Sequence, residues 1–269
     1  MERRGALKLS VHVIADLVLP VPTPTTLQIE AAQVAGVQAV ESPALTVAPF
    51  AEAEPFLDFY GNPCRRLMMV AGDVRLEYAA TVTLPDAPSP PAEKAHEAGG
   101  AHEADALHLP TDALLYTLPS RYCQSDKMVA MAQDMFGDVA PGFARVQTVC
   151  DWINAHITYQ YGVSDAGTSA YDTAAQRIGV CRDFAHLGIA FCRALNIPAR
   201  YVSGYCLGLA PPTSTPISRH GWTGAGWHST LPNGSPGPHW CKSPWDATPP
   251  TVHGARSTGT AKPKGCQSK

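Results

Sequence analysis

The sequence predicts an α+β protein in which a β-rich N-terminal domain precedes a largely helical one. Apolar and polar residues alternate with the period of a strand over residues 1–85, and the period becomes helical from residue 109 onward. Residues 86–108, between the two, have the composition of a linker. The chain has 269 residues, of which 45% are hydrophobic and 16% charged, so two domains with cores of their own are feasible.

The N-terminal domain is predicted from short alternating runs. Strand-like alternation occurs over residues 7–13, 26–30, 74–78 and 80–84. Residues 59–63 read Phe-Tyr-Gly-Asn-Pro, which is typical of a turn. We expect a small antiparallel sheet domain over residues 1–85 that carries no visible chemistry.

The linker contains three histidines that resemble a metal-binding tract. His96, His102 and His108 lie among Ala, Glu and Gly residues, which favours a solvated segment. The eight cysteines form no Cys-x-x-Cys pair, so a zinc site or a disulfide framework has little support. We predict no metal and no cofactor.

The second domain, residues 109–210, is expected to contain three helices. Ser125 should cap the first, which Gly137 ends, and Pro141 should open the second. The third should run from about Cys181 to Leu195, and a strand is expected to follow over residues 199–205. Its apolar stripe contains Phe184, Leu187 and Phe191.

Cys181 lies where a loop is predicted to become the third helix. The first turn of a helix has unpaired backbone N–H groups and the positive end of the helix dipole, and both favour a thiolate. We therefore expect the pKa of the Cys181 thiol to fall below the usual value of about 8.5. The backbone N–H of Cys181 could also donate to an oxyanion. Position alone still leaves open a buried, unreactive cysteine.

The residues around Cys181 resolve this choice. Residues 171–187 read YDTAAQRIGVCRDFAHL and residues 194–205 read ALNIPARYVSGY. Both segments closely resemble the nucleophile region of bacterial transglutaminase-like proteins. The resemblance extends back to residues 149–153 and 120–123, and the β-rich front is similar to the region that accompanies this domain in bacteria.

The resemblance implies a papain-like α+β domain with Cys181 as the nucleophile. In such a site a His activates the thiol and an Asp orients the imidazole, both from the sheet that follows the helix. The implied reaction is acyl transfer from a glutamine or peptide amide to an amine or to water. Asp183 and His186 lie on the Cys181 helix itself, so we expect Asp183 to stabilise the helix start and His186 to pack.

The resemblance implies an Asp-Phe-His-Ala segment soon after the strand and then a Phe-Asp-Pro-Thr segment, which would carry the His and the Asp, and neither occurs. Residues 211–269 are rich in Pro, Gly, Ser and Thr, with Asp246 as their only acidic residue, and we predict an aberrant, disordered tail. His220 and His228 lie there without a strand pattern to fix their geometry.

The absence of the His and Asp segments can be explained by a shifted reading frame. Reading the codons of residues 213–224 one base earlier permits Asp-Phe-His-Ala-Tyr-Phe-Glu-Ala-Trp-Leu-Asp-Gly, which contains the missing His. The same shift permits Ala-Phe-Asp-Pro-Thr over residues 228–232 and Gly-Arg-Asp-Ala-Ala-Asp over residues 245–251. We hypothesise that one base was lost near Pro212, in the genome or in the sequence record. Sequencing this stretch of DNA tests the hypothesis.

Two functional hypotheses follow. The first is a transglutaminase-like cysteine enzyme that is inactive as it stands, and the second is a non-catalytic binding or scaffold protein derived from that fold. A net charge of −3 and a pI near 6.3 give no basic surface for nucleic acid or an anionic membrane, so a protein or peptide substrate is the expected partner. No signal peptide is evident, and a cytoplasmic location is expected. Losing the C-terminal strands should expose Phe184, Leu187 and Phe191.

Overall fold

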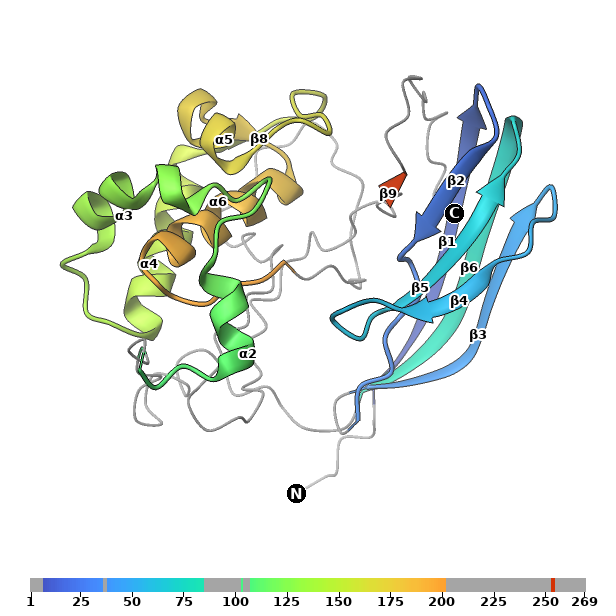
Figure 1. Ribbon diagram of the computed structural model, residues 1–269, viewed down its shortest axis with the longest axis horizontal. Helices are drawn as coiled ribbons and strands as arrows, with labels where there is room; N and C mark the ends of the chain where they lie inside the picture. Colours follow the sequence, from blue (N-terminus) through green and yellow to red (C-terminus); the bar gives the residue numbers. More distant parts are fainter. Residues whose placement is uncertain (1–6, 36–37, 85–102, 104–106, 202–252, 255–269) are drawn as a thin grey trace. The chain divides into compact units, whose positions relative to one another are not determined.

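The computed structural model describes residues 7–35, 38–84, 103, 107–201 and 253–254, and it divides the chain into two units (Figure 1). One unit comprises Met1–Ala87 with Pro249–Lys269, and the other comprises Pro88–Thr248. Among the described residues, the first unit contains strands only, and the helices lie in the second. The predicted α+β class, with the β-rich part first, is confirmed.

The first unit consists of two antiparallel sheets. The strand orders are β1(Leu7–Leu19)–β6(Gly72–Leu84)–β3(Ala39–Ala48) and β4(Glu54–Leu57)–β5(Pro63–Met69)–β2(Thr23–Leu27)–β9(His253–Gly254). Side chains from both sheets meet in one core, where Leu27 and Met69 of the second sheet pack with Leu76 of the first. The two sheets therefore form a sandwich that buries their inner faces.

Two of the predicted runs form one strand. The runs 74–78 and 80–84 both lie in β6, which pairs with β1 along thirteen residues, from Leu7 opposite Leu84 to Leu19 opposite Gly72. The predicted turn is confirmed: Asp58 Oδ1 accepts hydrogen bonds from the N–H groups of Tyr60 and Asn62, at 2.8 Å each. β3 was missed because its exposed, irregular sequence includes Pro43 and a bulge.

The second unit is built around one long helix. Its elements, in order, are α2(Thr111–Leu114), η1(Leu115–Thr117), η2(Ser125–Lys127), α3(Val129–Phe136), α4(Phe143–His156), β7(Thr158–Tyr159), α5(Ala170–Gln176), β8(Ile178–Gly179) and α6(Cys181–Ala194). Helices α3, α4 and α5 all contact α6. Nearly every residue of α6 after the first turn is buried, so this helix is the centre of the unit.

The predicted helix bounds are largely correct, with two differences. Ser125 begins a short 3-10 turn, and the α-helix starts only at Val129. The seven-residue helix α5 was not predicted, because a single short stretch gives too little periodicity to recognise. Residues 199–201 have no strand conformation, and the remainder of the strand expected over 199–205 lies outside the described residues.

The apolar stripe of α6 is buried, which corrects the prediction that it would be exposed. Phe184 is 6% exposed and Phe191 is 0% exposed. The Phe191 ring meets Phe136 of α3 edge-to-face at 5.2 Å and Trp152 of α4 at 5.5 Å. The prediction was wrong because periodicity identifies a buried face without identifying the element that covers it.

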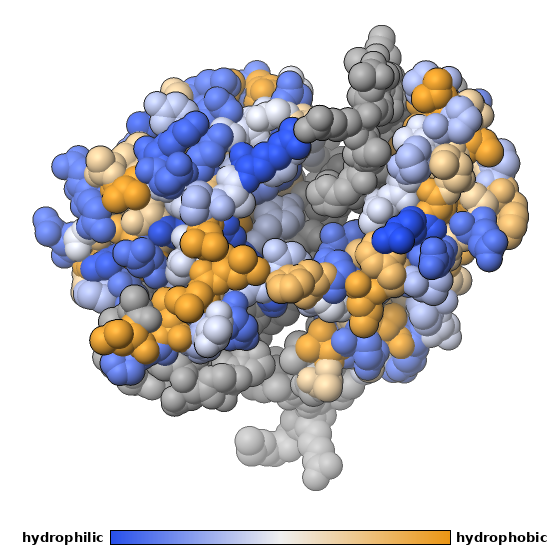
Figure 2. All heavy atoms as spheres, viewed as in Figure 1, coloured by the Kyte–Doolittle hydropathy of each residue, from blue (hydrophilic) through white to orange (hydrophobic). Residues whose placement is uncertain are grey.

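A group of exposed leucines lies on α2 and the turn after it. Leu114 and Leu115 are each 43% exposed and Leu118 is 54% exposed. In Figure 2, hydrophobic atoms gather over this part of the surface.

None of the described helices could span a bilayer, because none combines the length and the apolar character that this requires.

The predicted linker and tail fall mostly outside the described residues. Within 86–108, Glu103 is described, and its carboxylate binds Arg145 at 2.9 Å and the N–H of Gly142 at 3.0 Å. Within 211–269, only the strand β9 is described, and it pairs with β2. His96, His102, His220 and His228 lie outside the described residues. The residues to which the reading-frame hypothesis applies, 212–251, also lie outside them.

Candidate active site

Cys181 is the first residue of α6, where the sequence predicted the helix to begin. The preceding strand β8 pairs in parallel with β7, with Tyr159 opposite Gly179, and Val180 remains extended at φ −107° and ψ 177°. The chain therefore turns from strand to helix at the cysteine. Its side chain is half-buried at the positive end of a fourteen-residue helix.

Asp183 stabilises the helix start, as the sequence predicted. Its side chain is buried, and Oδ2 accepts a hydrogen bond from the N–H of Val180 at 2.9 Å. Oδ1 accepts from Nε of Arg182 at 3.2 Å and from Nη2 at 3.1 Å. A carboxylate in the first turn of a helix satisfies a donor there and interacts favourably with the dipole. Asp183 thus holds the turn that positions Cys181.

Gly179 allows this close approach. A Cβ at position 179 would lie 2.9 Å from Cβ of Asp183 and 3.3 Å from Cγ2 of Thr173 in α5. Real Cβ atoms are essentially never found under 3.0 Å from such an atom, so a larger residue would displace the start of α6. The glycine two residues before the cysteine is the sequence signal for this role, and sequence reasoning did not use it.

Arg182 joins the helix start to the loop before α5. Its Nη2 donates to Oγ of Ser164 and, at 2.7 Å, to the carbonyl oxygen of Asp165. The Asp165 carboxylate in turn accepts from the N–H groups of Gly167 at 2.7 Å and Thr168 at 3.1 Å, and these bonds lower the pKa of Asp165. The loop beside the cysteine is therefore internally tied and fixed to α6.

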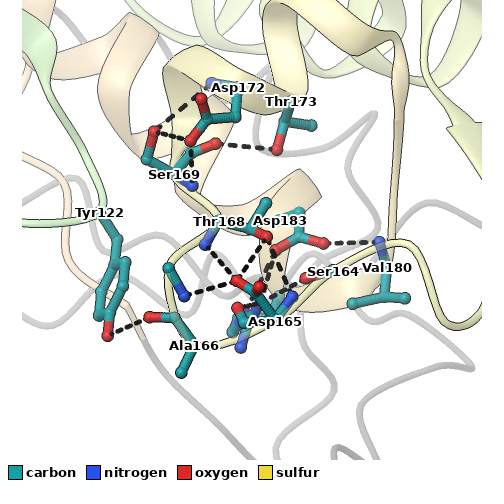
Figure 3. Close-up of polar contacts among 12 residues, drawn as sticks. Tyr122, Ser164, Asp165, Ala166, Thr168, Ser169, Asp172, Thr173, Val180 and Asp183 are labelled. Carbon is teal, nitrogen blue, oxygen red and sulfur yellow. Dashed lines mark hydrogen bonds and ion pairs between the residues drawn. The ribbon is translucent and has the colours of Figure 1, made fainter.

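Tyr122 fixes the other end of the same loop. Its hydroxyl donates to the carbonyl oxygen of Ala166 at 3.0 Å, and its own carbonyl accepts from the N–H of Ala170 at 2.8 Å. Helix α5 then begins with a capping box, in which the N–H of Ser169 donates to Asp172 Oδ2 at 2.9 Å (Figure 3). The two hydrogen bonds of Tyr122 join residues more than forty positions apart, which sequence spacing does not reveal.

His186 packs in the core and is not placed as a partner for the thiol. Its ring stacks on Tyr122 at 5.2 Å with an interplanar angle of 3° and contacts Tyr201 at 5.5 Å. The side chain is buried, and Nδ1 has no hydrogen-bond partner among the described residues. Burial lowers the pKa of His186 to about 4, and the positive charges of Arg182 and Arg193 act in the same direction. The imidazole is thus neutral near pH 7.

The buried His186 should make folding stability depend on pH. In the unfolded chain its pKa is 6.5, so between pH 6.5 and about pH 4 the unfolded state binds the proton and the folded state does not. The stability contributed by neutral His186 is complete above pH 6.5, falls as the pH drops to about 4, and then levels off. We expect a loss of about 3 kcal/mol over this window.

Urea unfolding at several pH values measures this loss. Because carboxylates also titrate near pH 4, the comparison is with His186→Phe, which keeps an apolar ring on Tyr122 and has no titrating group. The free energy of unfolding of His186→Phe should fall less steeply between pH 6.5 and pH 4. Parallel curves for the two proteins would refute the assignment.

The described part of the chain contains neither a candidate metal cluster nor a disulfide. Within the described ranges, no group of three or more His, Cys, Asp or Glu side chains could hold a metal ion. The five described cysteines form no disulfide, and burial raises the pKa of Cys123 and of Cys192. Cys181, by contrast, is half-buried at a helix start.

The geometry defines an α+β protein whose second unit is organised around a helix that begins at a cysteine. Residues 129–241 match the model of the transglutaminase-like superfamily. The second unit therefore carries a transglutaminase-like superfamily domain. The matched range runs past Pro212, although the Asp-Phe-His-Ala and Phe-Asp-Pro-Thr segments do not occur there.

A solved structure agrees with this assignment. It is a candidate cysteine protease from Cytophaga hutchinsonii, which shares 28% sequence identity with this chain at a TM-score of 0.73. The similarity covers 97% of this chain and 89% of that one, so it includes both units.

Bacterial relatives match a shorter part of the chain. An uncharacterized protein of Mycobacterium leprae is 33% identical over 87 residues, and one of Mycobacterium tuberculosis is 42% identical over 60 residues. The aligned segments span 30% and 19% of the lengths of these two proteins, respectively.

Proposed function

We propose that this chain is a cysteine enzyme of the transglutaminase-like superfamily, with Cys181 as its nucleophile, and that it lacks turnover as it stands. The observation that carries the proposal is the position of Cys181 as the first residue of the long helix α6, with a half-buried thiol. A thiol in that position experiences the helix dipole, and the first turn of a helix is where backbone N–H groups can donate to an oxyanion.

The reaction is acyl transfer through a thioester. The Cys181 sulfur attacks the carbonyl carbon of a glutamine or peptide amide, so a C–S bond forms. The amide C–N bond then breaks, and the amine leaves once it has accepted a proton. Water or a second amine attacks the thioester, the C–S bond breaks, and the sulfur regains a proton. Both proton transfers need a general acid–base close to the sulfur.

The missing acid–base is attributed to the reading frame. One base lost near Pro212 would remove the His and Asp segments that the shifted codons permit. His186 does not replace them, because its ring is stacked on Tyr122 in the core. An intact frame through the codons of residues 205–215 in freshly sequenced DNA would overturn this explanation.

A scaffold role is the second candidate. The exposed Leu114, Leu115 and Leu118 offer apolar surface of the kind found at protein–protein interfaces. In that case Cys181 would be a structural residue with ordinary reactivity. For either role the expected partner is a protein or peptide, and the cytoplasmic location predicted from the sequence stays a prediction.

Thiol labelling tests the nucleophile. We expect iodoacetamide to alkylate Cys181 in the folded chain at neutral pH about threefold faster than a cysteine in an unstructured peptide, because a lower pKa raises the thiolate fraction more than it lowers the nucleophilicity of the thiolate. Mass spectrometry of the Cys181 peptide gives the rate, and Cys150, which is buried, serves as the internal control. Alkylation no faster than that of the peptide would favour the scaffold role.

A further inference from the structure

The carboxylate of Asp183 lies close to the nucleophile and is shielded from solvent. Its side chain is 0% exposed, and Oδ2 accepts a hydrogen bond at 2.9 Å from the N–H of Val180, the residue before Cys181 (Figure 3). This bond and the covalent geometry of the chain limit the distance from Oδ2 to the Cys181 sulfur to about 11 Å at most. A negative charge that water does not screen opposes the ionisation of a neighbouring thiol.

Arg182 is the cation that compensates this carboxylate. Its Nε and Nη2 donate to Oδ1 of Asp183 at 3.2 Å and 3.1 Å. Nη2 also donates to Oγ of Ser164 and, at 2.7 Å, to the carbonyl oxygen of Asp165. The guanidinium is therefore held between the carboxylate and the loop, and its positive charge has a fixed place beside the start of α6.

We propose that Arg182 is a positioning residue of the Cys181 site, which cancels the charge of the buried Asp183 so that this carboxylate can order the helix start without suppressing the thiolate. The proposal rests on the proposed function, since it concerns the same nucleophile. The N–H of Val180 needs a side-chain acceptor at position 183, and a carboxylate supplies it. Without a cation, the same carboxylate would place a buried negative charge near a sulfur that must itself become an anion.

Other titratable groups surround the start of α6 in the described part of the chain. Backbone hydrogen bonds lower the pKa of Asp165 in the loop, so it remains a carboxylate while the thiol ionises. Burial raises the pKa of Tyr159 in β7, whose ring packs against Tyr161 at 5.4 Å, and burial lowers the pKa of His186 to about 4. Tyr159 and His186 thus stay neutral near pH 7, and the Arg182–Asp183 pair supplies the charges that a substitution can unbalance.

The test is a double-substitution cycle in the full chain, measured as the pH profile of Cys181 alkylation. Arg182→Gln leaves the carboxylate uncompensated, so the alkylation midpoint should rise by about one pH unit. Asp183→Asn keeps an acceptor for the N–H of Val180 but leaves the guanidinium uncompensated, so the midpoint should fall by about one pH unit. In the double variant both charges are absent, and the midpoint should return close to that of the parent chain.

The opposite signs distinguish charge compensation from a structural role. A loosened helix start would move the midpoint in one direction for both single variants, and at least as far for the double variant. Arg182→Lys keeps the charge and should stay close to the parent. Arg177→Gln is the matched control, because it removes an exposed cation four residues before the cysteine, and it should leave the midpoint unchanged.

Asp183→Asn and Arg182→Lys carry the test if Arg182→Gln fails to fold after its buried carboxylate loses its partner. A reactive Cys181 whose midpoint stays fixed in Asp183→Asn, or rises in it, overturns the role of Arg182 alone. A Cys181 that is alkylated in the parent chain no faster than a cysteine in an unstructured peptide overturns the proposed function.

Discussion

Inserting one base near codon 212 should convert a chain without measurable amide turnover into one whose turnover depends on Cys181. General acid–base groups contribute about 10²- to 10⁴-fold in rate. The chain as it stands has a helix-start thiol at Cys181, while the imidazole of His186 on the same helix is stacked in the core. Restoring the segments that the shifted codons permit would supply a general acid–base.

The measurement compares release of ammonia from a glutamine-containing peptide with and without an amine acceptor. Amine incorporation would indicate a transamidase, and equal release in both cases a hydrolase. Cys181→Ser in the restored frame is the matched control, and its rate should fall to background. Turnover by the unrestored chain that disappears in Cys181→Ala would contradict the prediction, because it would show that the described site already has an acid–base group.

Phe191→Ala should destabilise the second unit by about 3–5 kcal/mol. The ring is fully buried and meets Phe136 and Trp152 edge-to-face, so its removal loses apolar burial and leaves a cavity between three helices. Urea unfolding followed by circular dichroism at the helical band reports on this unit, since the described helices all belong to it.

Phe59→Ala is the matched control for that substitution. The Phe59 ring lies in the β4–β5 turn of the first unit and is 86% exposed. The same truncation there should change the free energy of unfolding by no more than about 0.5 kcal/mol. Similar small effects for both substitutions would mean that Phe191 is not packed between α3 and α4.

Several features of this protein could be predicted from local sequence because each depends on neighbouring residues. Alternation predicted the β-rich front, and period and capping predicted α4 and α6 to within a few residues. The residues around Cys181 were enough to indicate the superfamily and to place the cysteine at a helix start. The role of Asp183 also followed, because it requires only the spacing from Val180 to the third residue of the helix.

The tertiary structure decided which distant segments meet. β7 and β8 are two residues each, too short for any alternation, yet their pairing brings Tyr159 beside Gly179, two residues before Cys181. The same holds for Tyr122 and Arg182, which fix the loop before α5 from different parts of the chain. A period tells which side of a helix is buried, but the partner depends on chain closure over long distances. For that reason the helix start at Cys181 could be predicted from the sequence alone, and the residues that surround it could not.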